Sequence, residues 1–529
     1  MIFRTADMRC VFVSNFLRFD ACDCYQSFNL RFGDQMSLNL IEEAWIPVRM
    51  VDGTRRVIAP WQMADPHIAA PDWPRADLNL ACYEFLIGLV FMACPPEDLD
   101  DWVDARPDAD QLRRAFAPFA SAFNLLGEGP RFLQDLEELS GEPSSPDLLF
   151  IDSAGESTER KNADLMVHRD RYAILDLPSA AMALYAFQQF APAGGRGNRT
   201  SLRGGGPMVT LADPGQGLWA LVWANVPFGQ AAGLQDLPWM RPTITSETNL
   251  LIHHTDSTPV EAFFGMPRRL KLVGQNTVTG VVQRPNGTNY GIWRHPLSPY
   301  SRLKPGDDPL PQHPKSGRLP WRNWAGIVLS EPPREGSLRL RARCIEGYSD
   351  RHGVQPRRMI VAGWAMSKAT PIDFLWAELP LLAIDPEAQE LAQDLIVSAN
   401  DIRLELGKAL GLILSEGSAR EAQADQFWAA TTDDFTAALA KLAGRDPKIA
   451  LDRAAIAGPF VVALGRQALA QFDALALPGL SEGRAERAAA LIRQRGLLSA
   501  LIHGRSKPGA KLWLKLGLTP PETKRKETV

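Results

Sequence analysis

The sequence has few cysteines, and none of them forms a metal-binding pattern. The six are scattered: Cys10, Cys22, Cys24, Cys82, Cys94 and Cys344. Because no CxxC pair occurs, neither a zinc site nor a disulfide framework is indicated, and no metal is expected. Scattered thiols of this kind favour the reducing environment of the cytoplasm.

Membrane and export signals are also missing. No uninterrupted apolar run is long enough to span a bilayer, so no membrane partner is expected. The N-terminus carries charges throughout and lacks the basic-then-apolar order of a signal peptide.

Motifs for nucleotide binding and catalysis are absent as well. GxGxxG in a strand-loop-helix setting, GxxxxGK[ST], HExxH and GxSxG do not occur. Ser301 to Lys304 matches SxxK, but the elements that accompany this motif in enzymes are missing. No cofactor is therefore expected, and nothing argues positively for catalysis. An enzyme stays open as an alternative because catalytic residues can be distant in sequence.

There is no excess of positive charge, since the 529 residues carry a formal net charge of −4. With 45% hydrophobic and 22% charged residues, the composition is that of a soluble globular protein. The length predicts two or three domains. Any surface that binds nucleic acid must be local, built from clustered arginine and lysine.

One such cluster is present, GGRGNRTSLRGGG at Gly194 to Gly206, and no acidic residue occurs between Asp176 and Asp213. Glycine lets the backbone approach a ligand closely, and arginine brings a fork of donors suited to phosphate and base edges. A flexible surface loop would have the same composition. As DNA-binding candidates we take six residues of this loop: Gly194, Gly195, Arg196, Gly197, Arg199 and Arg203.

Residues 1–35 differ in character from the rest of the chain. They hold three of the six cysteines, and after Met36 the sequence changes to SLNLIEEAWIPVRM, which is typical of a domain start. We predict that residues 1–35 are either a misassigned start, with Met36 as the first residue, or a poorly ordered extension. An intact mass of the native protein that begins at Met1 would exclude the first possibility.

Residues 36–380 predict a mixed α/β domain. Alternation from Leu38 to Val51 indicates strands, with Pro47 on an edge strand because proline cannot donate to a ladder. Apolar stretches predict buried helices and strands. The predicted helices are 78–92 and 177–190, and the predicted strands are 208–211, 218–226, 338–344 and 359–364, with a turn at 365–368.

The sequence of residues 381–517 predicts helices and no strands. Apolar residues recur at helical spacing in four stripes, the first running from Leu391 to Ile413 and the second from Phe427 to Leu442. Gly458-Pro459 predicts a break or a kink before the third stripe, which starts at Phe460, and the fourth follows Arg484. Four amphipathic helices with short links predict a four-helix bundle, so the fold class is α+β. Residues 518–529 form a charged tail.

Three segments, taken in order with the helices last, resemble one family. They are Asn39 to Val48 (NLIEEAWIPV), Leu202 to Gly205 (LRGG) and Gly291 to Pro299 (GIWRHPLSP). The chain resembles the large subunit of type I-E Cascade, the CasA family, from about residue 37 to the end of the helices. The resemblance implies a large mixed α/β domain before a four-helix bundle.

The resemblance also implies a function that does not involve catalysis. The expected protein is a subunit of a CRISPR RNA surveillance complex that detects the protospacer-adjacent motif on duplex DNA, helps to start strand separation, and recruits a helicase-nuclease. Its expected partners are the other Cascade subunits, CRISPR RNA, double-stranded target DNA and that helicase-nuclease. Guide pairing reads most of the target, so the protein need read only a short duplex element, largely through the minor groove.

Site residues follow from the resemblance position by position. The family's glycine loop falls on Gly194 to Gly197, with Arg196 at a position where glycine is common. The lysine finger falls near Arg284, where arginine keeps the charge and changes its shape. The wedge that enters the duplex falls on Ser367 and Lys368, where the family has a glutamine.

A further loop, which reaches toward the CRISPR RNA end and the motif, falls on Asn162 to His168. Within it, Leu165 stands where an aromatic residue occurs in the family. The paired cysteines that bind zinc in some members are missing here.

Two other function classes stay open. The first is a hydrolase-type enzyme with its site in the α/β domain and the helices as a lid or dimer interface, which a deep pocket with clustered acids and bases would favour. The second is a general RNA-binding scaffold, which predicts stacking aromatic side chains on an open face. A shallow basic face that joins Arg196, Arg284 and Lys368 would favour the DNA-sensing subunit.

Overall fold

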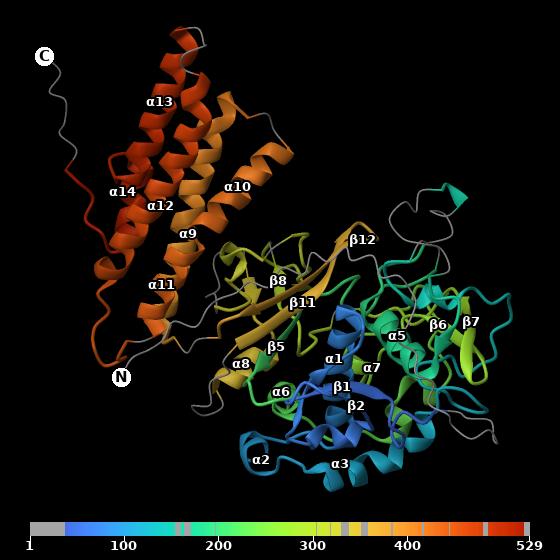
Figure 1. Cartoon of the computed structure of the whole chain (residues 1–529). Helices are drawn as coiled ribbons and strands as arrows, with labels where there is room; N and C mark the ends of the chain where they lie inside the picture. Colours follow the sequence, from blue (N-terminus) through green and yellow to red (C-terminus); the bar gives the residue numbers. More distant parts are fainter. Residues whose placement is uncertain are drawn as a thin grey trace, which may run out of the picture. The chain divides into compact units, whose positions relative to one another are not determined.

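The computed structural model describes residues 38–522, apart from 154–159, 163–170, 196, 292, 303, 318, 330–337, 351–357, 382–383, 415–416, 444 and 480–484. The predicted extension at residues 1–35 and Met36 lie outside the described residues. Within them, a mixed part with four small antiparallel sheets is followed by a helical region (Figure 1). The α+β class is therefore confirmed at this level.

The first sheet contains β1 (Ile46–Met50), β2 (Arg55–Ile58) and β3 (Ile68–Pro71). β1 is its middle strand and runs antiparallel to both neighbours, so the edge position predicted from Pro47 is wrong. Pairing with β3 begins only at Val48. The Pro47 carbonyl accepts a hydrogen bond from the Asp72 N–H at 2.9 Å, just beyond β3. Proline is tolerated because it precedes the paired stretch on that side.

Two buried helices, α1 (Ala76–Ala93) and α5 (Leu177–Phe190), pack against each other. Both were predicted, and α5 agrees at both ends. Asp176 begins α5 because its carboxylate accepts a hydrogen bond from the Ser179 N–H at 2.7 Å. Among the described residues, α1 is the helix long and apolar enough to cross a membrane, yet 83% of it is buried inside the protein. A core helix meets the same criteria.

Aromatic side chains fill the space around α1. Phe85 makes edge-to-face contacts with Trp45, Phe132, Tyr185 and Phe264, at centroid distances of 5.4–6.3 Å. This geometry places the positive edge of one ring on the negative face of the next. The core therefore joins the first sheet, α1, α5 and α7 (Glu261–Phe264).

The other sheets are also three-stranded and antiparallel. Their orders are β12-β11-β5, β4-β7-β6 and β10-β8-β9. The strands are β4 (Leu175–Asp176), β5 (Val209–Asp213), β6 (Arg269–Gly274), β7 (Thr277–Arg284), β8 (Tyr300–Arg302), β9 (Leu310–Pro311), β10 (Leu338–Leu340), β11 (Arg358–Ser367) and β12 (Thr370–Leu379).

Two predicted strands are wrong in whole or in part. Residues 218–226 form a helix, α6 (Leu218–Asn225), and every residue of it is buried. Apolar residues on every side do not distinguish a buried helix from a buried strand, so the sequence pattern was ambiguous. The basic segment 338–344 is a strand only to Leu340, after which α8 (Arg343–Asp350) begins.

Short elements complete this part of the chain. The α-helices are α2 (Leu99–Asp104) and α3 (Ala109–Phe116). The 3-10 helices, including two in the helical region, are η1 (Pro60–Ala64), η2 (Ala117–Ala122), η3 (Pro146–Leu149), η4 (Leu234–Asp236), η5 (Pro238–Met240), η6 (Trp321–Asn323), η7 (Leu410–Leu412) and η8 (Leu477–Gly479).

The described residues of the C-terminal region, after β12, form helices and connecting loops and no strand. Its helices are α9 (Pro386–Ala409), α10 (Ser418–Ala430), α11 (Thr432–Ala443), α12 (Arg453–Ala476), α13 (Ala485–Ile502) and α14 (Lys507–Lys515). α9 packs against α12 and α13. The predicted first stripe is its buried face, since Leu391, Ala399 and Ile402 are fully covered.

Two details of the helical prediction are wrong. The second stripe is divided between α10 and α11, which meet at Thr431; the Thr431 hydroxyl donates to the Phe427 carbonyl at 2.8 Å. Of the break or kink predicted at Gly458-Pro459, the break is wrong, because Pro459 lies inside α12, which begins at Arg453. Proline removes one backbone donor, and burial of residues on both sides of it holds the helix together.

Trp321 joins the two kinds of structure. It lies on η6, is 1% exposed, and donates from its indole Nε1 to the Trp428 carbonyl of α10 at 3.1 Å. Its ring stacks on Phe435 of α11, with centroids 4.2 Å apart and an interplanar angle of 16°. A single side chain from the mixed part therefore fills a space between helices of the C-terminal region.

Trp321→Ala should destabilise the protein by about 3–5 kcal/mol, because it leaves a cavity in the place of a buried aromatic ring. The midpoint of urea unfolding measures this loss. Trp61→Ala is the matched control, since Trp61 is only half-buried and the Arg113 guanidinium lies over it at 5.1 Å. Equal losses in the two variants would contradict a special role for Trp321.

Candidate nucleic-acid interface

The predicted glycine loop leaves α5 and leads to β5. Its glycine turn, defined here as Gly194, Gly195, Gly197 and Asn198, is closed by two backbone hydrogen bonds. The Gly194 N–H donates to the Asn198 carbonyl at 3.1 Å, and the Asn198 N–H donates to the Gly195 carbonyl at 3.2 Å. Gly195 and Gly197 have φ of 85° and 77°, a region that costs glycine little. Gly194 and Gly195 are exposed, whereas Arg196 lies outside the described residues.

The glycine turn packs against the turn that follows β7. The Asn286 N–H donates to the Gly197 carbonyl at 2.7 Å, and the Gln283 amide donates to the Asn198 side chain at 3.3 Å. A Cβ added to Gly197 would lie 2.6 Å from the Cβ of Pro285, so only glycine fits there. The fold thus brings two predicted DNA-binding segments, far apart in sequence, into direct contact.

Arg284 ends β7 beside this contact. It is half-buried, and no carboxylate within the described part of the chain pairs with it. Its guanidinium lies against Gly141, where a side chain would not fit. Its cross-strand partner Arg269, by contrast, is compensated by Asp135 at 2.5 Å and Glu137 at 3.0 Å. The charge of Arg284 is therefore free to meet an anion.

Arg199 is held by the protein itself. Its Nε donates to the Ser246 hydroxyl at 2.8 Å and its Nη2 to the Ser246 carbonyl at 3.2 Å. No carboxylate among the described residues neutralises it. The DNA contact of Arg199 stays a prediction, and its hydrogen bonds to Ser246 fasten the loop.

The structure places Arg203 in the core, which is inconsistent with the predicted contact with DNA. It is 1% exposed, and its Nη2 pairs with the Glu84 carboxylate of α1 at 2.5 Å. Its Nη1 donates to the Ser298 hydroxyl at 3.2 Å and lies 3.4 Å from His295 Nδ1. A buried charge needs such partners. Arg203 therefore anchors the glycine loop to α1 and to the segment around His295.

The protonation states of this cluster follow from burial. Burial and the positive charge of Arg203 hold the pKa of His295 well below its ordinary value, so His295 is neutral. Its Nδ1 accepts a hydrogen bond from the Leu297 N–H at 3.2 Å. Burial also raises the pKa of Glu84, although Arg203 opposes this shift. Sequence reasoning missed Glu84, but a single acid within the apolar run of residues 78–92 was the available signal.

Ser367 and Lys368 lie where the hairpin of β11 and β12 turns. Ser367 pairs with Thr370, so Lys368 and Ala369 form a two-residue loop, and Ser367 and Lys368 are exposed. Lys368 has φ of 57°, at a loop position usually taken by glycine. The other end of the glycine loop reaches this hairpin, because a Cβ on Gly206 would lie 2.8 Å from the Trp364 Cβ and 2.9 Å from the Met366 Cγ.

The predicted loop of residues 162–168 is described only at Asn162, which is exposed and has φ of 50°. Leu165 and His168 lie outside the described residues.

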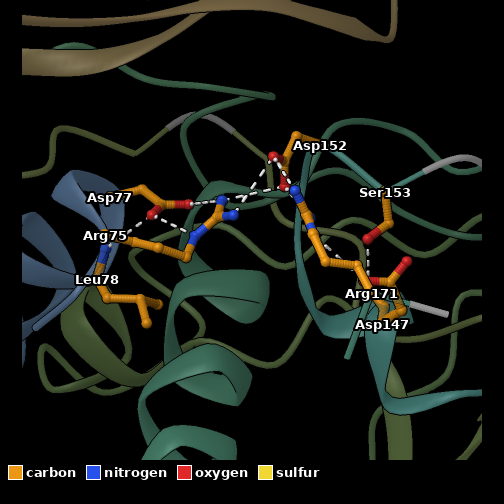
Figure 2. A network of polar contacts seen from close by, with 7 residues as sticks. All are labelled: Arg75, Asp77, Leu78, Asp147, Asp152, Ser153 and Arg171. Carbon is orange, nitrogen blue, oxygen red and sulfur yellow. Dashed lines mark hydrogen bonds and ion pairs between the residues drawn. The ribbon is translucent and has the colours of Figure 1, made fainter. Parts of the chain in front are cut away.

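Residues that precede and follow this loop in the sequence meet in one ion-pair network (Figure 2). Asp152 accepts hydrogen bonds from both Arg75 and Arg171, at 2.9–3.3 Å, and Arg75 also pairs with Asp77 at 2.8 Å. Burial raises the pKa of Asp152, but the hydrogen bonds and charges of Arg171 and Arg75 outweigh it, so the pKa falls below its ordinary value. The chain is therefore held firmly at 152 and at 171, an arrangement that sequence reasoning missed.

The described residues include no group of His, Cys, Asp and Glu that could hold a metal ion. A cavity of about 540 Å³ lies beside β1 and β2, lined by residues that include Asp52, Arg55 and His67. His67 pairs with Asp65 at 2.9 Å, but its side chain is 79% exposed. The buried acid and base in the core, Glu84 and His295, do not line this cavity. An enclosed site with clustered acids and bases is thus not found in the part that the structure describes.

The chain was compared with known protein families and with known proteins. Residues 39–461 match the model of the family described as CRISPR-associated protein Cse1. A comparison with curated proteins finds no match.

Solved structures share the fold. CasA from Thermus thermophilus superposes with a TM-score of 0.66 at 19% identity, over 88% of this chain and 100% of that chain. Cse1 from Acidimicrobium ferrooxidans gives 0.62 at 19%, over 89% and 99%. A chain of a CRISPR RNA-guided surveillance complex gives 0.67 at 17%, over 87% and 99%.

If Arg203 anchors the loop, Arg203→Met should cost about 3–5 kcal/mol in urea unfolding, because Glu84 is left buried without a counter-charge. Adding Glu84→Met should restore most of this loss, since both charges are then gone. A double variant as unstable as the single one would contradict the anchoring role.

Proposed function

The chain belongs to the CRISPR-associated Cse1 family, and on that premise we propose that it is the large subunit of a type I-E CRISPR RNA-guided surveillance complex. In this proposal it acts by binding and not by catalysis. It recognises the protospacer-adjacent motif on duplex DNA, promotes strand separation and recruits the helicase-nuclease.

One observation carries the proposal: the exposed glycine turn and the turn bearing Arg284 are packed together by the Asn286–Gly197 hydrogen bond. Glycine allows the backbone to approach a groove, and arginine without a carboxylate partner is attracted to the negative potential of a narrow minor groove. Because that groove carries degenerate base information, such a reader tolerates several motif variants.

The hairpin tip supports the strand-separating part of the proposal. Lys368 is exposed, keeps a backbone conformation unfavourable for a side-chain-bearing residue, and follows the stiff pairing of β11 with β12. A strained residue on a rigid hairpin is suited to enter a duplex. Lysine holds a phosphate there better than it stacks on a base.

The remaining parts of the proposal concern partners. The C-terminal helices form a four-helix bundle that packs against other subunits of the complex, and residues 36–380 form the domain that senses the motif. Besides those subunits, the partners are CRISPR RNA, duplex target DNA and the helicase-nuclease, and the location is the cytoplasm.

Neither alternative gains support. The hydrolase reading needs an acid and a base in a deep pocket, whereas Glu84 and His295 are fully buried. The RNA scaffold needs stacking aromatic side chains on an open face. Of the phenylalanine and tryptophan side chains that the structure describes, Phe228 is the one that is clearly exposed, at 43%.

The test adds the protein to the rest of the complex and measures binding of duplexes whose adjacent motif is intact or scrambled. The wild-type protein should increase affinity for the intact motif most. Arg284→Ala should lower that affinity by about 1–3 kcal/mol and reduce the discrimination between motifs. Lys368→Ala should weaken binding and slow strand separation, followed by fluorescence of a base analogue beside the motif.

Assembly of the complex should be unchanged in both variants. Arg114→Ala, a change at an exposed arginine on α3, is the control for loss of one surface charge. Unchanged target affinity in both variants, or failure of both to assemble, would refute these roles. An affinity gain that ignores the motif would reduce the protein to a general DNA clamp.

A further inference from the structure

Arg268, which no part of the proposed function uses, lies directly beneath the glycine turn. It precedes β6 and is 3% exposed. The Gln188 side chain of α5 holds its main chain twice: the Arg268 N–H donates to Gln188 Oε1 at 3.1 Å, and Gln188 Nε2 donates to the Arg268 carbonyl at 3.0 Å. Its guanidinium lies over the Phe187 ring, 5.1 Å from the centroid. The position of the side chain is therefore well defined.

The charge of Arg268 has no counter-ion within the described residues. Its Nη2 donates to the Pro192 carbonyl, and its Nε is buried without a hydrogen-bond partner. Burial lowers the pKa of Arg268 to about 10, so the group is still charged at neutral pH. The buried Arg203 and the half-buried Arg75 differ, since both pair with carboxylates. A buried, uncompensated cation is costly unless an anion completes it.

Gly194, which has no side chain, lies over the Arg268 guanidinium. Gly194 is exposed, and a Cβ added to it would lie 2.6 Å from Arg268 Nη1. Close by, none of the described residues accepts a hydrogen bond from the amide N–H of Gly195 or Gly197. An oxygen anion above the turn would thus meet free amides and the field of one arginine, the combination that binds phosphate.

We propose that Arg268 and the glycine turn form a phosphate site, and that its occupant is a backbone phosphate of the target duplex. This inference rests on the proposed function and adds a contact to it. A phosphate contact sets the position of the duplex and carries no sequence information, so it places the groove in front of Arg284 for reading.

The first test is Arg268→Met in the assembled complex. One phosphate contact is lost, so the duplex should bind about tenfold more weakly at 0.15 M salt. The slope of log affinity against log salt should fall by about 0.9, equally for intact and scrambled motifs. Thermal stability should be unchanged or higher, because methionine keeps the contact with Phe187 and removes a buried charge. Arg268→Lys should restore the salt slope.

A second variant keeps the arginine. Gly194→Ala should give the same loss of affinity and slope, because its Cβ obstructs the guanidinium, and the backbone of Gly194 is not in the left-handed region. Arg114→Met is the control for loss of an arginine. If the Arg268→Met variant does not assemble into the complex, the salt slope of the Gly194→Ala variant decides whether the site exists. An unchanged slope in Gly194→Ala overturns the site.

Single methylphosphonate substitutions in the duplex then locate the contact. One substitution should weaken binding by the wild type and have no further effect in Arg268→Met. If no position behaves this way, the occupant is not a duplex phosphate. Thermal stabilisation by inorganic phosphate that needs Arg268, together with an unchanged duplex slope, would assign the site to free phosphate and overturn the proposal.

Failure of this site is distinguishable from failure of the proposed function. A motif-dependent gain in the wild type with unchanged slopes in both variants would leave the function standing and remove the site. If the wild-type protein gives no motif-dependent gain in affinity, the proposed motif sensing is wrong. The slope of log affinity against log salt, measured on a non-specific duplex, then still tests whether Arg268 contributes to a phosphate contact.

Discussion

The buried ion pair between Glu84 and Arg203 is the constraint on which the rest of the structure depends. Two charges that are 0% and 1% exposed are stable together only in good geometry, because each has lost its water. One partner belongs to the central helix α1 and the other to the glycine loop. Ser298 and His295 complete the cluster and add the segment that follows the Arg284 turn. The glycine loop and the segment around His295 are thereby fastened to the core helix α1.

The ion pair between Glu84 and Arg203 also helps to fix the position of the glycine turn. The Gln188 side chain of α5 accepts a hydrogen bond from the Arg268 N–H, and the Asn286 N–H donates to the Gly197 carbonyl, so the turn is held next to the start of β6 and the end of β7. The arginines around it fall into two kinds. Arg203 is compensated inside the protein, whereas Arg284 and Arg268 have no carboxylate partner in the described part of the chain. This difference in charge compensation is not visible in the sequence, where all three look alike.

The fold as a whole combines rigid supports with short exposed segments. The mixed part builds rigid supports, such as the paired strands β11 and β12, and exposes short turns at their ends. The helical region meets it through Trp321, which enters the helices and stacks on Phe435. A firm scaffold with a few exposed turns is the arrangement that the proposed reading of a short duplex element would need.

The sequence by itself determined the buried helices α1 and α5, the α+β class and the family, because apolar periodicity and three spaced segments carry that information locally. It did not determine Leu218–Asn225, since a run apolar on every side fits a helix or a strand. It placed Pro47 on an edge strand, because strand order depends on partners elsewhere in the chain. Only the tertiary structure decided which arginines are compensated inside the protein. The sequence predicts a DNA contact for Arg203, whereas its buried partner Glu84 lies 119 residues away on α1. Charge compensation depends on distance in space, and sequence composition does not contain it.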